Sequence, residues 1–390
     1  MLIGIDGNEA NIKERVGVNV WAFEVLKHLQ GLRAKGQGIK ADTKFVIYLS
    51  RPPMEDLPMD TDNWKYRVIG PAKFWTRWRL PLDLYFHKPR PDIFLSLSHY
   101  APKWSPVPRI VCIMDLSFLK YPEAFKPAVF WQLKNWTEES VRYAAHIVTI
   151  SEFNKREIVR EYKYPEDRIT VIYPGISKMF KGPALPRQRR ALLKYGIRGK
   201  YLLFVGTRQQ KKNLDRLTQA FDLVRKKFPD IQLVVVGKTW RQFMSVKFTK
   251  LHNREVSQTA NVLMVGYVNE RDLPAVYAGA EALVLPSLYE GFGIPAAEAM
   301  GVGTLIAASN TTSLPEVMAG SGILFNPLDV QDMADKISLA LSMDKSRKRE
   351  LIKKGMIRAK RFSWDIAASE TIRLLNYFPA KRDQALPENN

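Results

Sequence analysis

The dominant feature of this sequence is a series of short, almost uninterrupted apolar segments separated by helical stretches. Residues 45–49, 93–95, 109–113 and 146–150 are segments of this kind. A strand that is apolar along its whole length is buried on both faces, as in a parallel sheet covered by helices. The pattern therefore predicts an α/β fold.

The series runs twice along the 390 residues. This length exceeds what one hydrophobic core usually accommodates, and a stretch rich in Pro, Lys and Arg at 181–200 separates the two series. We therefore expect two doubly wound, Rossmann-like domains that face each other across a cleft, residues 1–180 and 181–360. A helix and a loose tail follow in 361–390. Ligands in such sheets bind beyond the carboxyl ends of the strands.

A segment with two glutamates and two glycines follows one apolar run of the second series. Gly291 and Gly293 let the backbone approach a ligand closely, and Pro295 suits the first turn of a helix. The start of that helix favours an anion such as a diphosphate. Glu290 before the helix and Glu298 on it are suited to accept hydrogen bonds from sugar hydroxyls on either side. The segment points to a nucleotide sugar.

A second anion site follows the apolar residues 201–205. Gly206 provides the turn, and the cations Arg208, Lys211 and Lys212 come next. Cations in such a loop neutralise a diphosphate. They would also stabilise the negative charge that builds on the nucleotide as its bond to the sugar breaks.

The order of residues 290–300, Glu-Gly-Phe-Gly-Ile-Pro-x-x-Glu-Ala-Met, resembles the donor-site signature of the retaining family 4 glycosyltransferases, which have the GT-B fold. The resemblance implies that Glu290 contacts the sugar hydroxyls and Glu298 the ribose. It also implies donor contacts from the residues between them, Gly291, Phe292, Gly293 and Ile294.

In that family a cation directly after the glycine pairs with a lysine before Asn or Gly. Lys212 matches the second position, whereas Thr207 occupies the first and the arginine is displaced to Arg208. We assign Arg208 and Lys212 to the diphosphate, with Lys211 as the rival of Arg208.

Further positions follow from the resemblance alone. Gly206 belongs to the diphosphate loop, and the loops at Lys238 and Val268 border the nucleotide base, which backbone groups at Val268 would read. Gly17 lies in a flexible loop that closes near the sugar and the acceptor, so residues 1–180 form the acceptor side. The helix at 362–375 would cross back to the first domain.

The clearest departure from the family lies at Met114, where many relatives place a histidine near the donor sugar. Methionine cannot act as a base, so no catalytic histidine is assigned there. Asp115, the next residue, matches the motif and would act at the site or fix its loop. His99 follows an earlier strand and could point at the same cleft, and a purely structural role is the alternative.

The charge is strongly basic, with 60 Lys and Arg against 39 Asp and Glu and a net charge of +21. Such a field attracts anions, but the cations are spread along the chain without a nucleic-acid-binding signature, so nucleic acid is an unlikely partner. In Lys73–Arg79, aromatics interleave with cations, which suits the headgroups of an anionic bilayer or a lipid-linked acceptor. A core-facing aromatic stripe is the alternative.

One cysteine, Cys112, argues against a disulfide framework, and no apolar run reaches the length of a membrane span. We expect a cytoplasmic protein that also binds the inner face of the membrane peripherally. Asp60 and Asp62 have the spacing of a metal-binding pair but lie in a Pro-broken loop. We therefore expect no metal, and no cofactor besides the donor.

The resemblance implies a retaining hexosyltransferase that moves a sugar from a nucleoside diphosphate to a glycan or lipid-linked acceptor. The motif is similar to that of mannosyltransferases, so GDP-mannose is the first expected donor, and UDP-glucose and UDP-N-acetylglucosamine stay open. A nucleotide-sugar epimerase of the same fold is one alternative, although it needs further acid–base groups. A basic membrane- or nucleic-acid-binding module is another, although it leaves the two carboxylates unexplained.

Overall fold

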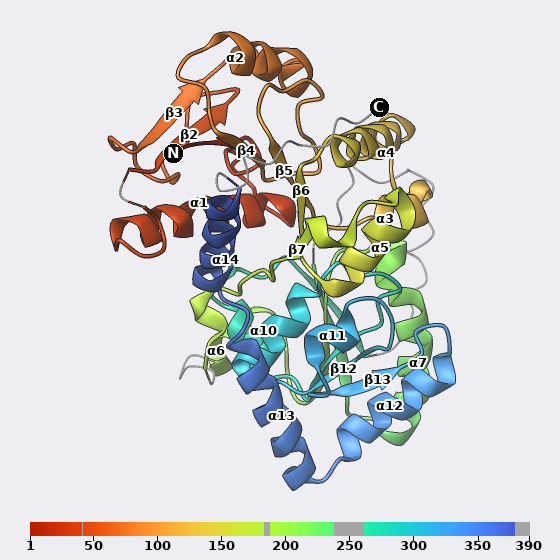
Figure 1. Ribbon diagram of the computed structural model, residues 1–390. Helices are drawn as coiled ribbons and strands as arrows, with labels where there is room; N and C mark the ends of the chain where they lie inside the picture. Colours follow the sequence, from red (N-terminus) through yellow and green to blue (C-terminus); the bar gives the residue numbers. More distant parts are fainter. Residues whose placement is uncertain (41, 183–187, 238–260, 379–390) are drawn as a thin grey trace. The chain divides into compact units, whose positions relative to one another are not determined.

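A computed structural model describes residues 1–40, 42–182, 188–237 and 261–378 (Figure 1). The chain divides into two compact units, the first built from residues 1–116, 131–175 and 363 onward and the second from residues 117–130 and 176–362. The expected first domain of residues 1–180 differs from the first unit at residues 176–180 and at the longer segment 117–130. This segment belongs to the second unit because Ser117 and Tyr121 contact residues that lie far along the chain, which no local pattern predicts.

The first unit contains a seven-stranded parallel sheet with the order β3-β2-β1-β4-β5-β6-β7. Its strands are β1 (Leu2–Asp6), β2 (Lys44–Leu49), β3 (Trp64–Val68), β4 (Ile93–Ser96), β5 (Arg109–Ile113), β6 (His146–Thr149) and β7 (Ile169–Val171). Its helices are α1 (Val18–Ala34), the π-helix η1 (Trp75–Arg79), α2 (Leu80–Phe86), α4 (Pro127–Arg142, from residue 131), α5 (Glu152–Tyr162), the 3-10 turn η3 (Glu166–Arg168) and α14 (Trp364–Tyr377).

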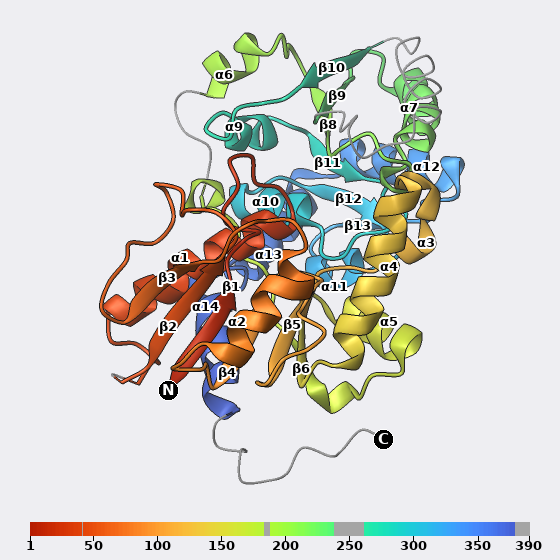
Figure 2. The same cartoon turned by 90° about the horizontal axis from the view of Figure 1, so that it is seen from above.

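Helices cover both faces of this sheet because successive strand residues point to opposite sides. Ile47 packs with α1 and α14, whereas the next residue, Tyr48, packs with η1 and α2. Figure 2 shows α1 and α14 on one side of the strands and α2 on the other. The last helix thus shares the core of the first unit, where Trp364 packs on Trp21 with ring centroids 5.9 Å apart.

The second unit contains a six-stranded sheet with the order β10-β9-β8-β11-β12-β13, also parallel. Its strands are β8 (Tyr201–Val205), β9 (Gln232–Val236), β10 (Val262–Gly266), β11 (Ala282–Leu285), β12 (Ile306–Ser309) and β13 (Ile323–Phe325). Its helices are α3 (Ser117–Lys120), η2 (Pro122–Ala124), η4 (Lys178–Phe180), α6 (Gln188–Lys194), η5 (Gln210–Lys212), α7 (Leu214–Lys227), α9 (Leu273–Ala278), α10 (Ile294–Val302), α11 (Leu314–Met318), α12 (Val330–Ser342) and α13 (Lys345–Ala359).

Both sheets have the order of a doubly wound fold, in which the first strand of each unit lies in the middle and the order reverses beside it. In the second unit α7 and α12 pack side by side on one face, with a core that includes Phe221 and Ile337. The strand order reverses between β8 and β11. The loops that follow these two strands therefore border the crevice where such sheets bind ligands.

The prediction of an α/β fold with two parallel sheets is confirmed, and the predicted strands lie within a few residues of the observed ones. The short edge strands β7 and β13 were not predicted, because three residues are too few to show a pattern. Within the described ranges, none of the helices combines the length and apolar composition that a membrane span requires.

We predict that Trp364→Ala lowers the free energy of unfolding by about 3–5 kcal/mol, because it removes a large buried side chain from the contact between α1 and α14. Trp364 is 8% exposed. Urea unfolding monitored by circular dichroism measures the effect. Trp131→Ala is the matched control, since that side chain is 61% exposed. Equal unfolding energies for the two variants would contradict the packing described above.

Candidate functional site

Two loops of the second unit lie side by side because the strands before them are paired. β8 and β11 are parallel neighbours, so their carboxyl ends bring residues 206–213 next to residues 286–293. The backbone N–H of Leu288 donates to the carbonyl oxygen of Lys211 at 2.7 Å and joins the two loops directly. This edge of the sheet therefore collects the residues of both predicted anion sites.

Glu290 and Lys212 form an ion pair between these loops. The ammonium nitrogen of Lys212 lies 2.6 Å from Oε1 of Glu290, and Ser287 donates its hydroxyl hydrogen to the same oxygen at 2.7 Å. Glu290 is only 8% exposed, so the pair is weakly screened by water. No described residue donates to Oε2 of Glu290, which leaves that oxygen as an acceptor for a ligand hydroxyl.

The backbone around Glu290 is held by the loop that precedes α11. The N–H of Glu290 donates to Oγ1 of Thr312 at 3.2 Å. The hydroxyl of Ser313 lies 2.9 Å from the carbonyl oxygens of both Glu290 and Phe292. The buried ring of Phe292 packs edge-on against Phe362, with centroids 5.1 Å apart. These contacts fix the carboxylate before any ligand arrives.

The start of α10 requires glycine at position 293. Gly293 has φ of 96°, and a Cβ atom there would lie 2.7 Å from Cδ2 of Leu314, so a larger residue meets both strain and a clash. Gly291 before it is buried, and Ile294 after it is 36% exposed. The chain thus enters the helix in a tight turn, and the N–H groups of its first turn favour an anion.

Glu298 on α10 accepts a hydrogen bond from the hydroxyl of Tyr277 at 2.7 Å. Burial raises the pKa of Glu298 to about 7, with Glu270 adding to the rise and the bond from Tyr277 opposing it. Burial also raises the pKa of Tyr277 well above its usual value, so the tyrosine stays a donor. Sequence reasoning missed Tyr277, because a tyrosine on a short helix carries no signal of its own.

The three cations of the first loop are in different surroundings. Only Lys212 reaches the carboxylate of Glu290, whereas the ammonium group of Lys211 lies 2.9 Å from Oγ of Ser117 on α3. Arg208 is half-buried before η5, and this burial lowers the pKa of its guanidinium group. Gly206 lies beside the lysine stem, since a Cβ there would be in ordinary van der Waals contact with Cδ of Lys212, at 3.7 Å.

Asn213 supports this arrangement and was not predicted. It adopts φ of 58° at the start of α7. Its buried amide donates to the carbonyl oxygens of Pro286 at 3.0 Å and Pro327 at 2.7 Å. Asparagine tolerates this left-handed conformation better than most residues. The one feature of the sequence that could have indicated this role is its position directly after Lys212. Through its bond to Pro286, the amide ties the loop of that lysine to the loop of Glu290.

The loops expected to border the base follow the neighbouring strands β9 and β10. The N–H of Gly237 after β9 donates to the carbonyl oxygen of Gly266 on β10 at 2.7 Å. A Cβ at Gly237 would lie only 2.0 Å from the carbonyl oxygen of Gly206, so the β8 and β9 loops are also in contact. Val268 is buried beyond β10, and Lys238 lies outside the described residues.

The remaining predicted residues belong to the first unit. His99 follows β4 and Asp115 follows β5, and both are half-buried. Burial lowers the pKa of His99, and the charge of Asp115 opposes this shift, so the imidazole is neutral at neutral pH. Gly17 is exposed at the start of α1 with φ of 52° and open space around it. Met114 is buried, and its carbonyl oxygen accepts a hydrogen bond from Asn154.

A buried carboxyl at the end of β1 was not predicted as functional. Asp6 accepts bonds from the N–H and the side-chain amide of Asn8, each at 3.0 Å. Burial raises the pKa of Asp6 to about 7, and Glu9 contributes to the rise. Glu9 in turn accepts a hydrogen bond from Asn19. This acidic group occupies the carboxyl edge of the first sheet, as Glu290 does in the second.

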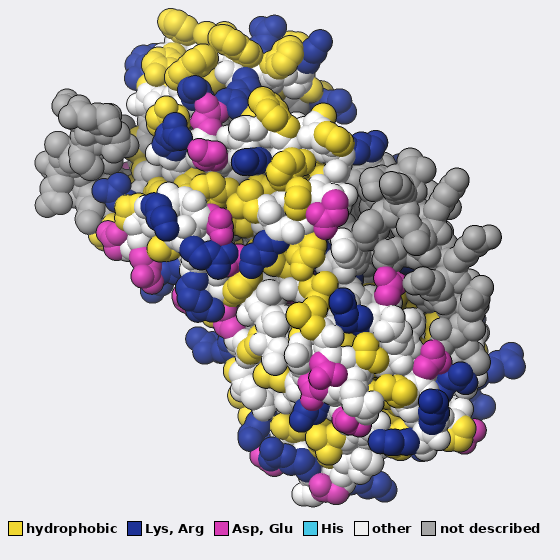
Figure 3. Space-filling view, turned by 90° about the vertical axis from the view of Figure 1, so that its right-hand side faces the viewer, with side chains coloured by type: hydrophobic (Ala, Val, Ile, Leu, Met, Phe, Trp, Pro, Cys, Tyr) yellow, Lys and Arg dark blue, Asp and Glu magenta, His cyan; other side chains and the backbone are white. Residues whose placement is uncertain are grey.

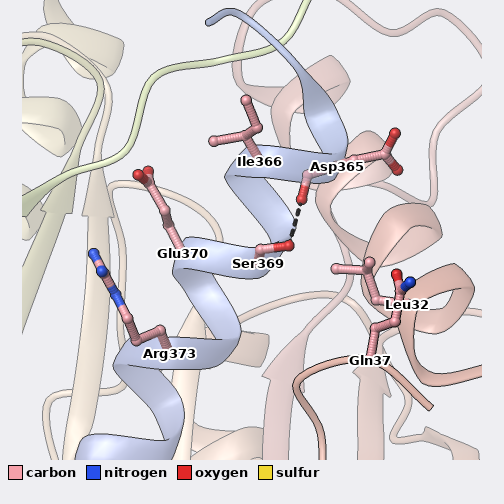
Figure 4. A pocket seen from close by; sticks show the side chains of 7 residues that line it. All are labelled: Leu32, Gln37, Asp365, Ile366, Ser369, Glu370 and Arg373. Carbon is pink, nitrogen blue, oxygen red and sulfur yellow. Dashed lines mark hydrogen bonds between the residues drawn. The ribbon is translucent and has the colours of Figure 1, made fainter. Parts of the chain in front are cut away.

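Metal ligands do not gather in the part of the chain that the structure describes, where no group of three His, Cys, Asp or Glu side chains could hold an ion. Asp60 is exposed and pairs with Lys65 at 2.7 Å. A separate hollow of about 320 Å³ lies between α1 and α14, and Figure 4 shows the side chains of Glu370 and Arg373 extending from α14 beside it. Its mixed charges offer no cradle for a diphosphate.

Two family models match the chain: "Glycosyl transferases group 1" over residues 189–355 and "Glycosyltransferase Family 4" over residues 46–178. O-antigen chain mannosyltransferase B of Escherichia coli is 31% identical over 317 residues, which are 79% of this chain and 78% of that protein. Serotype-specific mannosyltransferase WbdA of Escherichia coli is 28% identical over 220 residues, 56% of this chain but 27% of WbdA.

Among solved structures, Anabaena HepE in complex with UDP and glucose has a TM-score of 0.71 and 13% identity, covering 96% of this chain and 99% of that one. At this identity the likeness concerns the fold, and it extends over both units.

We predict that Asn213→Ala lowers the free energy of unfolding more than Asn213→Gly does. Both variants leave two buried carbonyl oxygens without a donor, which costs about 1–3 kcal/mol. Only alanine adds the strain of the left-handed conformation, about 1 kcal/mol. Urea unfolding measures both variants.

Asn261→Ala is the matched control, because Asn261 is also left-handed (φ 66°) but exposed, and donates to Pro229 at 3.0 Å. We expect this control to lose about 1 kcal/mol, the strain alone. Losses at Asn213 no larger than the control loss would show that its amide does not support the site.

Proposed function

Because the chain belongs to the family 4 glycosyltransferases, we propose that it transfers mannose from GDP-mannose, with retention of the anomeric configuration, to a glycan or lipid-linked acceptor. It is a glycosyltransferase of the GT-B fold; the sugar, the stereochemistry and the acceptor are the proposal. Two of its relatives are named mannosyltransferases, which supports mannose as the transferred hexose.

The ion pair between Lys212 and Glu290 is the observation that carries this proposal. A cation and a carboxylate held 2.6 Å apart beside a helix start can separate onto the two halves of a sugar nucleotide. Lys212 would pass to a phosphate oxygen, with Arg208 as the second cation. Glu290 would then accept a hydrogen bond from a sugar hydroxyl, and Glu298 one from the ribose.

In the proposed reaction the acceptor hydroxyl oxygen forms a bond to the anomeric carbon while the bond from that carbon to the phosphate oxygen breaks. The hydroxyl proton passes to the departing diphosphate, on the same face of the sugar. Lys212 and Arg208 would stabilise the negative charge that grows on this diphosphate. These fixed cations and the helix start would supply the stabilisation that a metal ion gives elsewhere, so we propose a metal-independent enzyme.

The acceptor class also bears on where the enzyme works. A lipid-linked glycan is presented at a membrane surface, and the strongly basic chain is attracted to anionic lipids. We therefore propose that the enzyme acts on the cytoplasmic side, bound peripherally to the inner face of the membrane.

We predict that the protein releases GDP from GDP-mannose faster than it releases UDP from UDP-glucose or UDP-N-acetylglucosamine, and that Lys212→Ala lowers this turnover by about 10²–10³-fold. The loss follows from the missing stabilisation of the departing diphosphate. A coupled assay for released nucleoside diphosphate measures the rates, and circular dichroism checks that the variant is folded.

Lys211→Ala is the matched control, because this neighbouring lysine binds Ser117 and not the carboxylate. We expect less than about a tenfold loss there, which is the effect of a peripheral group. A large loss of turnover in Lys211→Ala and none in Lys212→Ala would show that Lys211, and not Lys212, stabilises the departing diphosphate. Release from none of the sugar nucleotides would contradict the proposed function.

We also predict that binding of GDP-mannose releases protons from Glu298. Its pKa of about 7 leaves it partly protonated when free, and hydrogen bonds from ribose hydroxyls favour the ionised form and lower that pKa. Binding should release most of a proton about one pH unit below this pKa and little about one unit above it. Affinity should rise with pH up to about 7 and then level off.

Calorimetry in two buffers of different ionisation enthalpy, without acceptor, measures the released protons. Glu298→Gln should abolish the release. Asp6→Asn should leave it unchanged, although the pKa of Asp6 is also raised to about 7, because Asp6 belongs to the first unit and is given no donor contact. Persistent release from the Glu298 variant would remove Glu298 from the donor site.

A further inference from the structure

The helical segment formed by η1 and α2 exposes a stripe of large apolar side chains. Phe74 directly precedes η1 and Trp78 lies on it, whereas Leu82 and Phe86 lie one turn apart on the same side of α2. They are 60%, 54%, 49% and 80% exposed. A contiguous apolar stripe of this kind marks a surface that binds something. Of the aromatics in Lys73–Arg79, only Trp75 turns into the core.

The core side of this segment is filled independently of the stripe. Trp75, Leu80 and Leu84 are buried against Tyr48 and Phe94 on the sheet. The stripe is therefore not required to hold the segment in place, and its exposure is not a consequence of poor packing.

Positive charge surrounds the stripe. Lys73, Arg79 and Lys88 are exposed, whereas the acidic groups nearby are already paired. Asp83 accepts hydrogen bonds from Arg67, and Glu139 pairs with Arg77 and Lys103. In Figure 3 hydrophobic and basic side chains alternate over the upper end of the molecule, where α2 lies in Figure 1.

A hollow of about 390 Å³ opens beside the stripe, between the end of β3 and α2. Arg67, which lines it, is neutralised by Asp83 and also lies 2.8 Å from Nε2 of His87. Arg79 on its rim forms no ion pair or hydrogen bond through its side chain with any described residue. The hollow therefore has one uncompensated cation, and Leu82 and Phe86 line it beside that cation.

We propose that this surface, defined by the stripe Phe74, Trp78, Leu82 and Phe86 and the cations Lys73, Arg79 and Lys88, docks on the anionic phospholipids of a bilayer. The phosphate of one lipid would bind Arg79 in the hollow, and the stripe would enter the boundary between headgroups and acyl chains. Aromatic and aliphatic side chains flanked by cations suit that boundary. A protein partner is less well suited, because the stripe offers few groups that could form the hydrogen bonds of a specific protein interface.

This inference specifies the surface for the membrane association proposed above. It does not require the transfer reaction, because lipid binding is measured without any donor. A failure of either proposal can therefore be told from a failure of the other.

Co-sedimentation of the full chain with vesicles tests the proposal, using phosphatidylcholine alone and phosphatidylcholine with roughly one third phosphatidylglycerol. We expect at least about tenfold stronger partitioning to the vesicles with phosphatidylglycerol, and a decrease in about 0.5 M salt. Leu82→Ser combined with Phe86→Ser should lower partitioning at least about tenfold, because the inserted apolar area is lost. Arg79→Gln should lower it about fivefold.

Matched controls come from exposed residues of the second unit. Leu328→Ser combined with Ile357→Ser changes side chains that are 64% and 57% exposed. Arg361→Gln removes an exposed arginine with no side-chain partner among the described residues. Both control variants should bind vesicles as the unchanged protein does. Every variant should keep its thermal unfolding temperature and its turnover with a water-soluble acceptor.

Four results would overturn the proposal. Equal binding to both kinds of vesicle would show that Lys73, Arg79 and Lys88 do not recognise anionic lipids. Unchanged binding by the Leu82 and Phe86 double variant would remove the stripe. The protein could also fail to bind vesicles and instead self-associate in sedimentation velocity. If the double variant abolished that self-association, the stripe would be a contact between copies of this chain. Binding of free glycerol phosphate as strongly as vesicles would make the hollow a phosphate site unrelated to a membrane.

Discussion

The largely buried ion pair between Lys212 and Glu290, whose side chains are 15% and 10% exposed, is the interaction on which the rest of the site depends. Burying two charges costs desolvation energy that their attraction does not always recover, so such a pair is not expected for stability alone. It links the loops after β8 and β11 at the point where the strand order of the sheet reverses. The pair holds both groups in place until the donor binds, and in the proposed reaction each partner then exchanges the other for a part of the sugar nucleotide.

The surroundings of the pair make it rigid. Asn213 ties the lysine loop to the chain before Glu290, and Ser313 holds the backbone on the other side of the carboxylate. Gly293 then turns the chain into α10 without a clash. A site whose charged groups are oriented in advance needs little reorganisation when charge develops in the transition state.

Carboxyls with raised pKa values lie at the carboxyl edges of both sheets. Glu298 in the second unit is half-buried beside Tyr277, and Asp6 in the first is buried at the end of β1. In both cases burial is the main cause of the shift. The first unit differs in its surface, because η1 and α2 cover one face of its sheet with a few core residues and leave an apolar stripe outside. One helical segment thus packs the sheet and also presents the surface that we propose docks on a bilayer.

The sequence by itself determined the alternation of strands and helices, the parallel sheets, and the residues of the segment from Glu290 to Glu298, because these depend on local periodicity and on the chemistry of single positions. Tertiary structure alone decided that Lys212, and not Lys211, meets Glu290, that Tyr277 covers Glu298, and that residues 117–130 belong to the second unit. These are contacts between positions far apart along the chain, and they follow from strand pairing and burial, which no local pattern encodes. The aromatics of Lys73–Arg79 show the same division: the sequence left open which of them face the core, and packing against Tyr48 and Phe94 chose Trp75.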